Sequence, residues 1–265
     1  MKISKNMWRS AAVVTGALML AVGGPASATH SWNGYHWARS GAELTVPVAD
    51  NVDATWDGYL NTAIADWNQS TVINSPKVPG SVSPKRCNAV AGTIQVCNAA
   101  YGRTGWLGIA SIWLSNGHIS QGTTKLNDTY FAMAQYNNPS ERALVTCQEV
   151  GHNYGLGHQD EDFNTDNTTS CMDYTNWPQG NEHPDAHDYQ QLLDIYNHVE
   201  AASSTVGGRG ASGVDAGDTP GEWGRAVHFT ADGRPDVFQR VEAPGQMVIT
   251  HVYWANGEGP RGRAE

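Results

Sequence analysis

The most constraining feature of the sequence is a run of polar residues at helical spacing, set between a strong helix start and a strong helix end. Asn138 can cap a helix, Pro139 fits its first position, and Glu141 can reach back to the cap. Gly155 predicts the helix end, because glycine adopts the left-handed conformation of a C-terminal cap at little cost. We therefore expect a helix from Pro139 to about Tyr154.

The polar residues in this segment are spaced for metal binding. Gln148 and His152 lie one turn apart on the same helix face, so both side chains can reach one ion. Gly155 allows a sharp turn, after which His158 can return to the same point. Glu149 lies beside these residues. Two imidazoles, a third donor and a carboxylate that can act on water are what metal-assisted hydrolysis requires.

These residues resemble the metzincin zinc peptidases, whose pattern is H-E-x-x-H-x-x-G-x-x-H followed by a methionine turn. Glu149, His152, Gly155 and His158 stand at matching positions. Gln148 stands where the pattern has its first histidine.

The resemblance extends to the methionine turn of the family and covers about residues 42–200. Met172 matches the methionine that packs beneath the metal site. Tyr174 matches a tyrosine that, in astacin-like and serralysin-like members, contacts the metal or stabilises the oxyanion. The run over 107–126 resembles the edge strand that aligns a peptide substrate in the family.

The resemblance implies an α/β (α+β) fold of the zincin kind: a twisted mixed sheet, an active-site helix, the methionine turn and a C-terminal helix. It also implies hydrolysis of peptide bonds with one catalytic Zn²⁺. The implied residues are His152, His158 and Gln148 as metal ligands, Glu149 as general base and then acid, and Tyr174 as the donor to the oxyanion.

Gln148 is the departure from the pattern that matters most. A glutamine carbonyl is a weaker neutral donor than imidazole, so the ion should be held less tightly. Asp160 or Glu161 is an alternative source of the missing donor. Glu149 is retained, which favours an active enzyme over two other interpretations: a silent metzincin-fold protein that binds a peptide or protein, and a structural metal site.

The four cysteines are Cys87, Cys97, Cys147 and Cys171. An even number in an exported chain argues for disulfides, and four cysteines allow three pairings. We favour the local pairing, Cys87 with Cys97 and Cys147 with Cys171. The resemblance gives the second bridge a purpose, because it would join the metal-binding helix to the methionine turn.

Hydrophobic periodicity predicts the remaining elements. Two further helices are expected over 54–69, capped by Asp53, and over about 185–199. An edge strand is expected over 42–48, where Pro47 interrupts the pattern. Further strands are expected over 93–97, 107–114 and 119–126, with a hairpin turn at Asn116-Gly117. Two or three short strands are expected over 223–255, with turns at Asp232-Gly233 and Pro244-Gly245.

Residues 1–28 are typical of a signal peptide, with a basic start, a short apolar stretch and an A-x-A cleavage site. We expect a catalytic domain over 29–200, a Gly/Ala/Ser-rich linker over 201–222 and a β-rich extension over 223–265. The formal net charge of −10 argues against nucleic acid or anionic membrane partners. The expected protein is therefore a secreted, extracellular monomer that acts on protein or peptide substrates.

Four other histidines have no assigned role and are expected to be solvated: His118, His183, His187 and His198.

Overall fold

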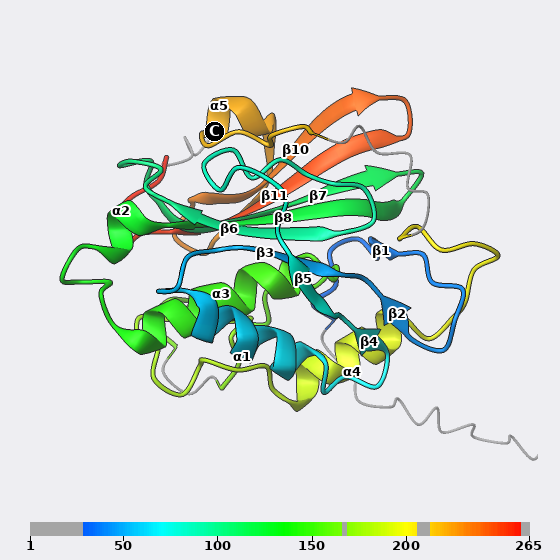
Figure 1. Cartoon of the computed structure of the whole chain (residues 1–265). Coiled ribbons are helices and arrows are strands. Elements are labelled where there is room, and N and C mark those ends of the chain that lie inside the picture. The colour runs from blue at the N-terminus through cyan, green and yellow to red at the C-terminus, as the bar shows by residue number, and fades with distance from the viewer. Residues whose placement is uncertain (1–28, 166–168, 206–212, 261–265) are drawn as a thin grey trace, which may run out of the picture.

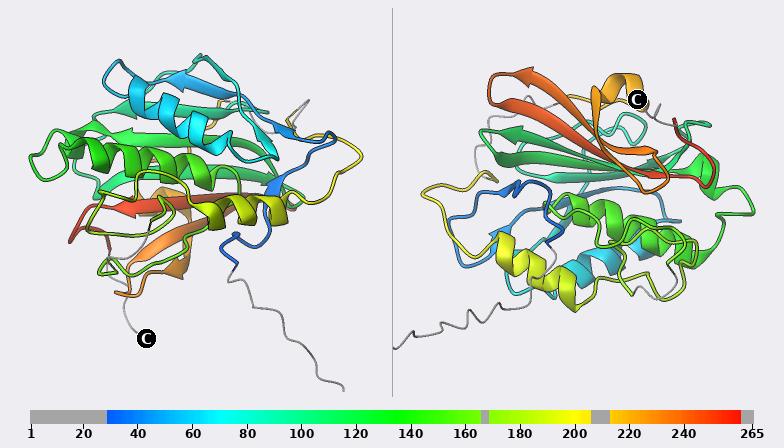
Figure 2. Two further views of the ribbon diagram at one scale, coloured as in Figure 1. Left: turned by 90° about the horizontal axis from the view of Figure 1, so that it is seen from below. Right: turned by 180° about the vertical axis from the view of Figure 1, so that it is seen from behind.

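A computed structural model describes residues 29–165, 169–205 and 213–260, so the predicted signal peptide lies outside the described residues. The longer helices cover one face of a large sheet, a short helix near the C-terminus lies on the other face, and the C-terminal strands extend that sheet sideways (Figures 1 and 2). This mixed α/β architecture with a predominantly sheet core is compatible with the expected α+β class. Among the described helices, none has the length and apolar character needed to cross a bilayer.

The main sheet has nine strands, and β1 (His36–Trp37) joins it by pairing with β8. β2 (Leu44–Thr45) and β4 (Ile73–Asn74) form a separate small sheet. The other strands of the main sheet follow the order β5 (Lys77–Pro79), β3 (Val48–Asn51), β6 (Ile94–Ala99), β8 (His118–Asn127), β7 (Trp106–Ser115), β11 (Gln246–Trp254), β10 (Pro235–Ala243) and β9 (Arg225–Phe229).

The strand expected over 42–48 is wrong in both extent and position. The chain instead forms β2 before Pro47 and β3 after it, because proline has no N–H to donate to a ladder. β3 lies between β5 and β6, not at an edge. The hairpin expected at Asn116-Gly117 is confirmed, with φ of 52° and 88°, the positive values that a tight hairpin turn requires.

The helices are α1 (Asp57–Trp67), α2 (Asp128–Phe131), α3 (Pro139–His152), α4 (Ala186–Ile195) and α5 (Pro220–Trp223). The predicted start of α3 is confirmed, since the Asn138 side chain accepts a hydrogen bond from the Glu141 amide at 2.8 Å. α1 begins later than expected, because the Asp53 side chain accepts from the Thr55 amide and forms a turn before the helix.

The C-terminal strands change the character of the sheet. β11 pairs antiparallel with β7 from Gln246 opposite Ser115 to Trp254 opposite Trp106. The interpretation of 107–126 as a free, substrate-aligning edge is therefore wrong for the described structure. The turns expected before β10 and β11 are confirmed, with positive φ at Gly233 and Gly245.

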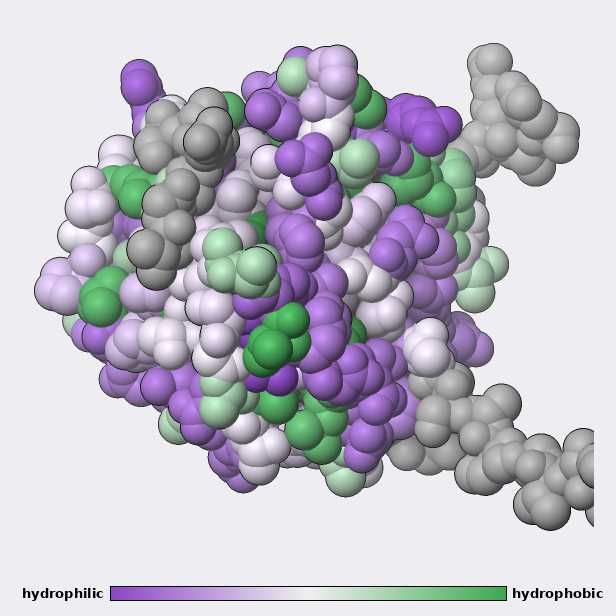
Figure 3. Space-filling view, turned by 90° about the vertical axis from the view of Figure 1, so that its right-hand side faces the viewer, coloured by the Kyte–Doolittle hydropathy of each residue, from purple (hydrophilic) through white to green (hydrophobic). Residues whose placement is uncertain are grey.

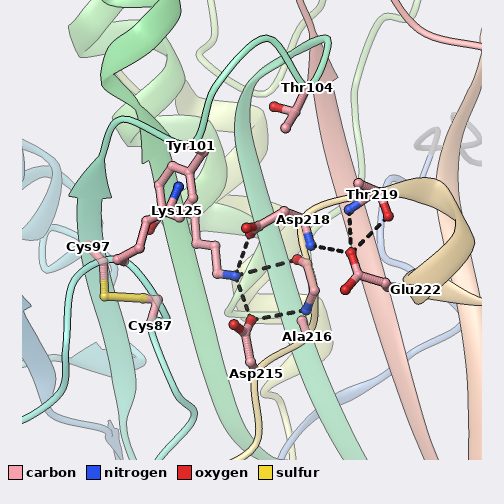
Figure 4. A network of polar contacts seen from close by, with 12 residues as sticks. Cys87, Cys97, Tyr101, Thr104, Lys125, Asp215, Ala216, Asp218, Thr219 and Glu222 are labelled. Atoms are coloured by element: carbon pink, nitrogen blue, oxygen red, sulfur yellow. Dashed lines mark hydrogen bonds and ion pairs between the residues drawn. A yellow bond between two sulfur atoms is a disulfide. The ribbon is translucent and has the colours of Figure 1, made fainter.

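A buried lysine holds the segment that leads into these strands. Thr124 on β8 bonds to the Glu149 carbonyl on the helix side, so the next residue, Lys125, points to the opposite face of the sheet. Its ammonium lies 2.5 Å from Asp215 Oδ1 and 2.8 Å from Asp218 Oδ1 (Figure 4). A fully buried ammonium needs such partners, so this contact attaches the segment before α5 to the sheet.

Both favoured disulfides are present, Cys87–Cys97 and Cys147–Cys171. The second closes a sequence separation of 24 residues and joins α3 to the methionine turn. A bridge over a loop of this length typically contributes about 3 kcal/mol to stability.

Gly151 on α3 allows α1 and the methionine turn to pack closely against the helix. A Cβ atom at this position would lie 2.6 Å from Met172 Sδ and 2.6 Å from a ring carbon of Trp67. Both neighbours are fully buried, so neither has room to move away.

We therefore predict that Gly151→Ala lowers the free energy of unfolding by about 1–3 kcal/mol, although alanine is the better helix former. Gly58 on α1 is the matched control, because a Cβ atom added there would have nothing within 4 Å. Gly58→Ala should leave stability unchanged or raise it by up to about 1 kcal/mol. Urea unfolding followed by tryptophan fluorescence measures both, and equal effects of the two substitutions would contradict the prediction.

Candidate metal centre

The last turns of α3 place three of the predicted site residues in the interior. Gln148 and Glu149 have no exposed surface, and His152 is 1% exposed. The close approach of β7 explains part of this burial, because a Cβ at Gly108 would lie 2.7 Å from Glu149 Cγ. The site is thus enclosed between the helix, the sheet and the methionine turn.

Gln148 connects the helix to the methionine turn through its amide nitrogen. This nitrogen donates to the Cys171 carbonyl at 2.9 Å and to the Asp173 carbonyl at 3.1 Å. Two carbonyl partners fix the orientation of the amide, since only the nitrogen can donate. Gln148 Oε1 has no hydrogen-bond partner among the described residues. A buried carbonyl without a partner costs about 1–3 kcal/mol, so an electropositive group would be stabilised there.

His152 and His158 lie together, as the sequence predicted, with ring centroids 4.7 Å apart and planes at 89°. His152 Nδ1 lies 2.8 Å from the Leu156 carbonyl, so Nδ1 carries the proton and the Nε2 lone pair is free. Burial, followed by the neighbouring His251 and His158, lowers the pKa of His152 well below its usual value. His152 is therefore neutral, which is the form that binds metals.

The methionine turn supplies Met172 and Tyr174, both fully buried. The ring of Tyr174 lies 4.1 Å from that of His158, and its hydroxyl donates to Asp236 Oδ2 at 3.0 Å. Burial, reinforced by Asp236, raises the pKa of Tyr174 well above its usual value. Tyr174 is thus a neutral hydrogen-bond donor next to a candidate ligand.

The C-terminal strands supply polar residues that sequence reasoning missed. Asp236 lies on β10 with His228 Nδ1 2.8 Å from its Oδ1, and its Oδ2 is 3.7 Å from His158 Nδ1. Burial alone would raise the pKa of Asp236, but the hydrogen bond from His228 and the electrostatic interaction with His158 outweigh it and lower that pKa. Asp236 is therefore an anion inside the site. No motif spacing links it to α3.

His251 on β11 is the second residue that sequence reasoning missed. Its ring stacks on His152 with centroids 4.1 Å apart and planes at 13°, and neither nitrogen has a hydrogen-bond partner within the described ranges. Burial lowers the pKa of His251 to about 3. Metal–imidazole bonds lie in the ring plane, so two stacked rings cannot both direct lone pairs at one ion. His251 therefore covers His152 in this arrangement.

Of the two residues considered as replacements for the first ligand, Glu161 faces the site and Asp160 does not. Glu161 Oε1 lies 3.9 Å from His158 Nδ1, and one ligand atom each from His158, Glu161 and Asp236 lies within 4.8 Å of the others. The Asp160 carboxylate instead accepts from the Asp162 amide at 2.8 Å.

The donors present are of the kinds that a zinc ion accepts. His152 has a free lone pair at Nε2, His158 lies perpendicular to it, and Gln148 offers an oxygen unpartnered within the described part of the chain. Nitrogen donors together with amide or carboxylate oxygens are ligands that Zn²⁺ accepts. Asp236 adds the negative charge that favours a cation.

Glu149 is shielded by β11. Burial raises the pKa of Glu149 well above its usual value. The backbone amide of Tyr253 on β11 has the opposite effect and lowers this pKa, but by less. A cavity of about 280 Å³ lies beside this region, between the start of α3, the loop around Phe163 and the turn before β10. Its lining includes Glu141, Glu161 and Tyr253.

The cavity gives a prediction about pH. Burial raises the pKa of Glu141 to about 7, from the usual 4.5 that applies in the unfolded chain. Between these values the folded state binds more protons than the unfolded state, so stability falls as the pH rises. Glu141→Gln cannot ionise, and we expect it to exceed wild type by about 1–2 kcal/mol above pH 7 and to match it near pH 4. Urea unfolding from pH 4 to pH 8 tests this.

The exposed Glu43 is the control, since Glu43→Gln removes one charge without changing a buried group. If Glu141→Gln retains the pH dependence of wild type, the carboxyl of Glu141 is not buried in the folded protein.

Comparison with known proteins adds little to this geometry. No protein-family model matches the chain, and no curated protein matches it. Among solved structures, it is similar to the high choriolytic enzyme 1 of the medaka fish Oryzias latipes, a hatching-enzyme zinc protease. The two share 14% identity with a TM-score of 0.34, over 62% of this chain and 95% of that chain. A TM-score this low carries no argument about the function of this chain.

Proposed function

We propose that the chain is a secreted, zinc-dependent endopeptidase of the metzincin type, and that the described form is latent. One observation supports the proposal: Gln148 and Glu149 are fully buried, yet Gln148 Oε1 and both carboxylate oxygens of Glu149 have no hydrogen-bond partner among the described residues. A packed core without a ligand has no reason to bury these atoms without partners. The rings of His152 and Tyr174 both lie against His158 nearby. The two disulfides suit an oxidising compartment, which agrees with export.

The proposed roles follow from the contacts. His152, His158 and the Gln148 oxygen hold the ion, which when bound would polarise the peptide carbonyl and the attacking water. Glu149 takes a proton from the water and returns it to the leaving amine. Tyr174 donates its hydroxyl hydrogen bond to the developing oxyanion, for which it must leave Asp236.

The C-terminal hairpin, β10 and β11, lies where an extended peptide would have to bind. An extended peptide aligns on a sheet edge by main-chain hydrogen bonds, and β11 already makes these bonds with β7. The same strand places His251 on His152 and the Tyr253 amide against Glu149. Hydrolysis therefore requires the hairpin to move away from β7.

The second candidate function is a silent protein that uses the metzincin scaffold to bind a peptide or protein. The continuous pairing of β7 with β11 favours it, because a permanently filled edge leaves no place for a substrate. The two candidates differ in one respect: only the enzyme needs the Glu149 carboxylate.

We also propose a domain organisation in which export removes residues 1–28. The catalytic domain then spans 29–200, and a linker over 201–222 connects it to the extension over 223–265, with protein or peptide as the substrate.

The first test uses the chain beginning at Thr29, with zinc content and casein hydrolysis as readouts. Glu149→Gln preserves shape and removes the base, so it should keep the zinc and lower hydrolysis at least about a hundredfold. Gln148→His should raise zinc affinity, because imidazole is the stronger donor. Equal hydrolysis of casein by wild type and Glu149→Gln would contradict the proposal that the chain is an enzyme. A silent wild type together with an active Gln148→His would identify a pseudoenzyme.

The second test concerns latency. Ser111 on β7 and Thr250 on β11 face each other with their hydroxyl oxygens 2.9 Å apart, so cysteines at both positions can cross-link the strands. We expect the oxidised Ser111→Cys/Thr250→Cys variant to lose casein hydrolysis completely, because the hairpin can no longer leave β7.

The matched control is Val241→Cys/Met247→Cys, which cross-links β10 to β11 and leaves the hairpin free to move as a unit. If the variant that links β7 to β11 hydrolyses casein as well as this control does, the hairpin does not occupy the substrate position.

A further inference from the structure

Three histidines converge on one carboxylate oxygen away from the candidate metal centre. The Nε2 atoms of His36, His118 and His198 lie 3.0, 3.1 and 3.1 Å from Glu200 Oε1. The ring of His36 is nearly perpendicular to both other rings, with centroids 5.0 Å apart in each case. Sequence reasoning expected His118 and His198 to be solvated and gave them no role; both are partly exposed in the structure, but each contacts Glu200.

The positions of the protons in this cluster are difficult to explain with hydrogen bonds alone. His36 Nδ1 lies 2.6 Å from the Gly34 carbonyl, which can only accept, so Nδ1 carries the proton. A neutral His36 then directs the lone pair of Nε2 at a carboxylate oxygen, which is repulsive. A positive centre between these atoms removes the conflict.

Three donors on one oxygen are also too many. A carboxylate oxygen has about two lone-pair sites, and Glu200 Oε2 is already engaged with the Arg39 amide at 2.9 Å. With hydrogen bonds alone, His118 and His198 would donate from Nε2 as neutral rings and His36 would have to carry a second proton, which places three donors against one carboxylate oxygen.

The distances fit an ion bound between these groups. Ligands at about 2.0–2.1 Å from one ion lie about 3.0–3.4 Å apart, depending on the coordination geometry. The contacts between Glu200 Oε1 and the three ring nitrogens fall at the lower end of this range. Ligand atoms of His36, His198 and Glu200 also lie within 4.8 Å of one another, whereas His118 is not part of this group and contacts Glu200 alone.

The cluster joins three parts of the chain that lie far apart in the sequence. His36 lies on the two-residue strand β1, which pairs with the start of β8 at His118. His198 and Glu200 follow α4, and Glu200 exchanges backbone and side-chain hydrogen bonds with Arg39. β1, the turn between β7 and β8, and the chain after α4 meet on one side of the molecule, whose surface is largely hydrophilic (Figures 1 and 3).

We propose that His36, His198 and Glu200 form a second, structural binding site for a divalent transition-metal ion, and that His118 holds the Glu200 carboxylate in place from β8. Two imidazoles and one carboxylate suit Zn²⁺ best among the available ions. Side-chain exposures of 15% for His36, 36% for His118, 48% for His198 and 20% for Glu200 leave the ion a path from solvent. The bound ion holds the N-terminal segment and the chain after α4 against the β7–β8 hairpin, so it stabilises the folded state.

The test measures zinc binding by the chain that begins at Thr29, after removal of metal with EDTA. Zinc titration against a chromophoric chelator and elemental analysis should give one equivalent less for His198→Ala than for wild type. His198 is half exposed, so this substitution should leave the apo fold intact. The melting temperature of wild type should rise by about 5–10 °C at a hundredfold excess of zinc over the Kd of this site, and this gain should be lost in His198→Ala.

His183→Ala is the matched control, because His183 is also exposed and is paired with a carboxylate, Asp66, outside the cluster. It should bind as much zinc as wild type. His36→Ala provides a second disruption of the site from another element, β1. The comparison is a difference of one ion, so it holds whether or not the α3 site also binds zinc.

Equal zinc stoichiometry and equal thermal shifts in wild type, His198→Ala, His36→Ala and His183→Ala would overturn the proposal. That result would make the cluster a set of hydrogen bonds between the three histidines and Glu200. Co²⁺ substitution gives an independent check, since absorption bands of a tetrahedral nitrogen–oxygen site should weaken in His198→Ala and persist in His183→Ala.

Discussion

The pairing of β11 with β7 is the interaction on which the arrangement of the site depends. Without it, β7 would be the sheet edge, and the face of α3 that carries Glu149 and His152 would border open space. With it, Tyr253 and His251 are placed directly over these residues. The burial that lowers the pKa of His152 and raises that of Glu149 depends on this one pair of strands. The contacts of Lys125 with Asp215 and Asp218 hold the segment that precedes these strands, so they also help to keep β10 and β11 next to the site.

Local signals in the sequence predicted the elements well. The Asn138 cap, the Asn116-Gly117 turn and both disulfides follow from short-range rules that depend on backbone conformation and chain separation. The predicted strand at 42–48 is wrong because a single proline decides which amide can join a ladder. Short-range rules therefore succeed where one residue and its neighbours determine the outcome.

The partners that come from far along the chain could not be predicted in the same way. Asp236 and His251 belong to the site only because β10 and β11 pair in a particular register, and register is not encoded by spacing from α3. The same reason explains why His36, His118 and Glu200 were not grouped: their convergence depends on the parallel pairing of β1 with β8 and on the path of the chain after α4. An alternating strand with a buried histidine is a weak signal of this kind, since it places a polar group where only a partner or an ion can satisfy it.

Gln148 illustrates why a ligand position can change without loss of the surrounding structure. Its amide nitrogen holds two carbonyls of the methionine turn, which a histidine at the same position could not do, because an imidazole that ligates a metal has only one N–H left to donate. Glutamine is a weaker metal ligand than histidine, but it attaches α3 more firmly to the methionine turn. The Cys147–Cys171 bridge links the same two segments nearby. A site held this rigidly can keep the remaining donors in place when the ion is absent. That rigidity favours a protein that folds before any ion binds.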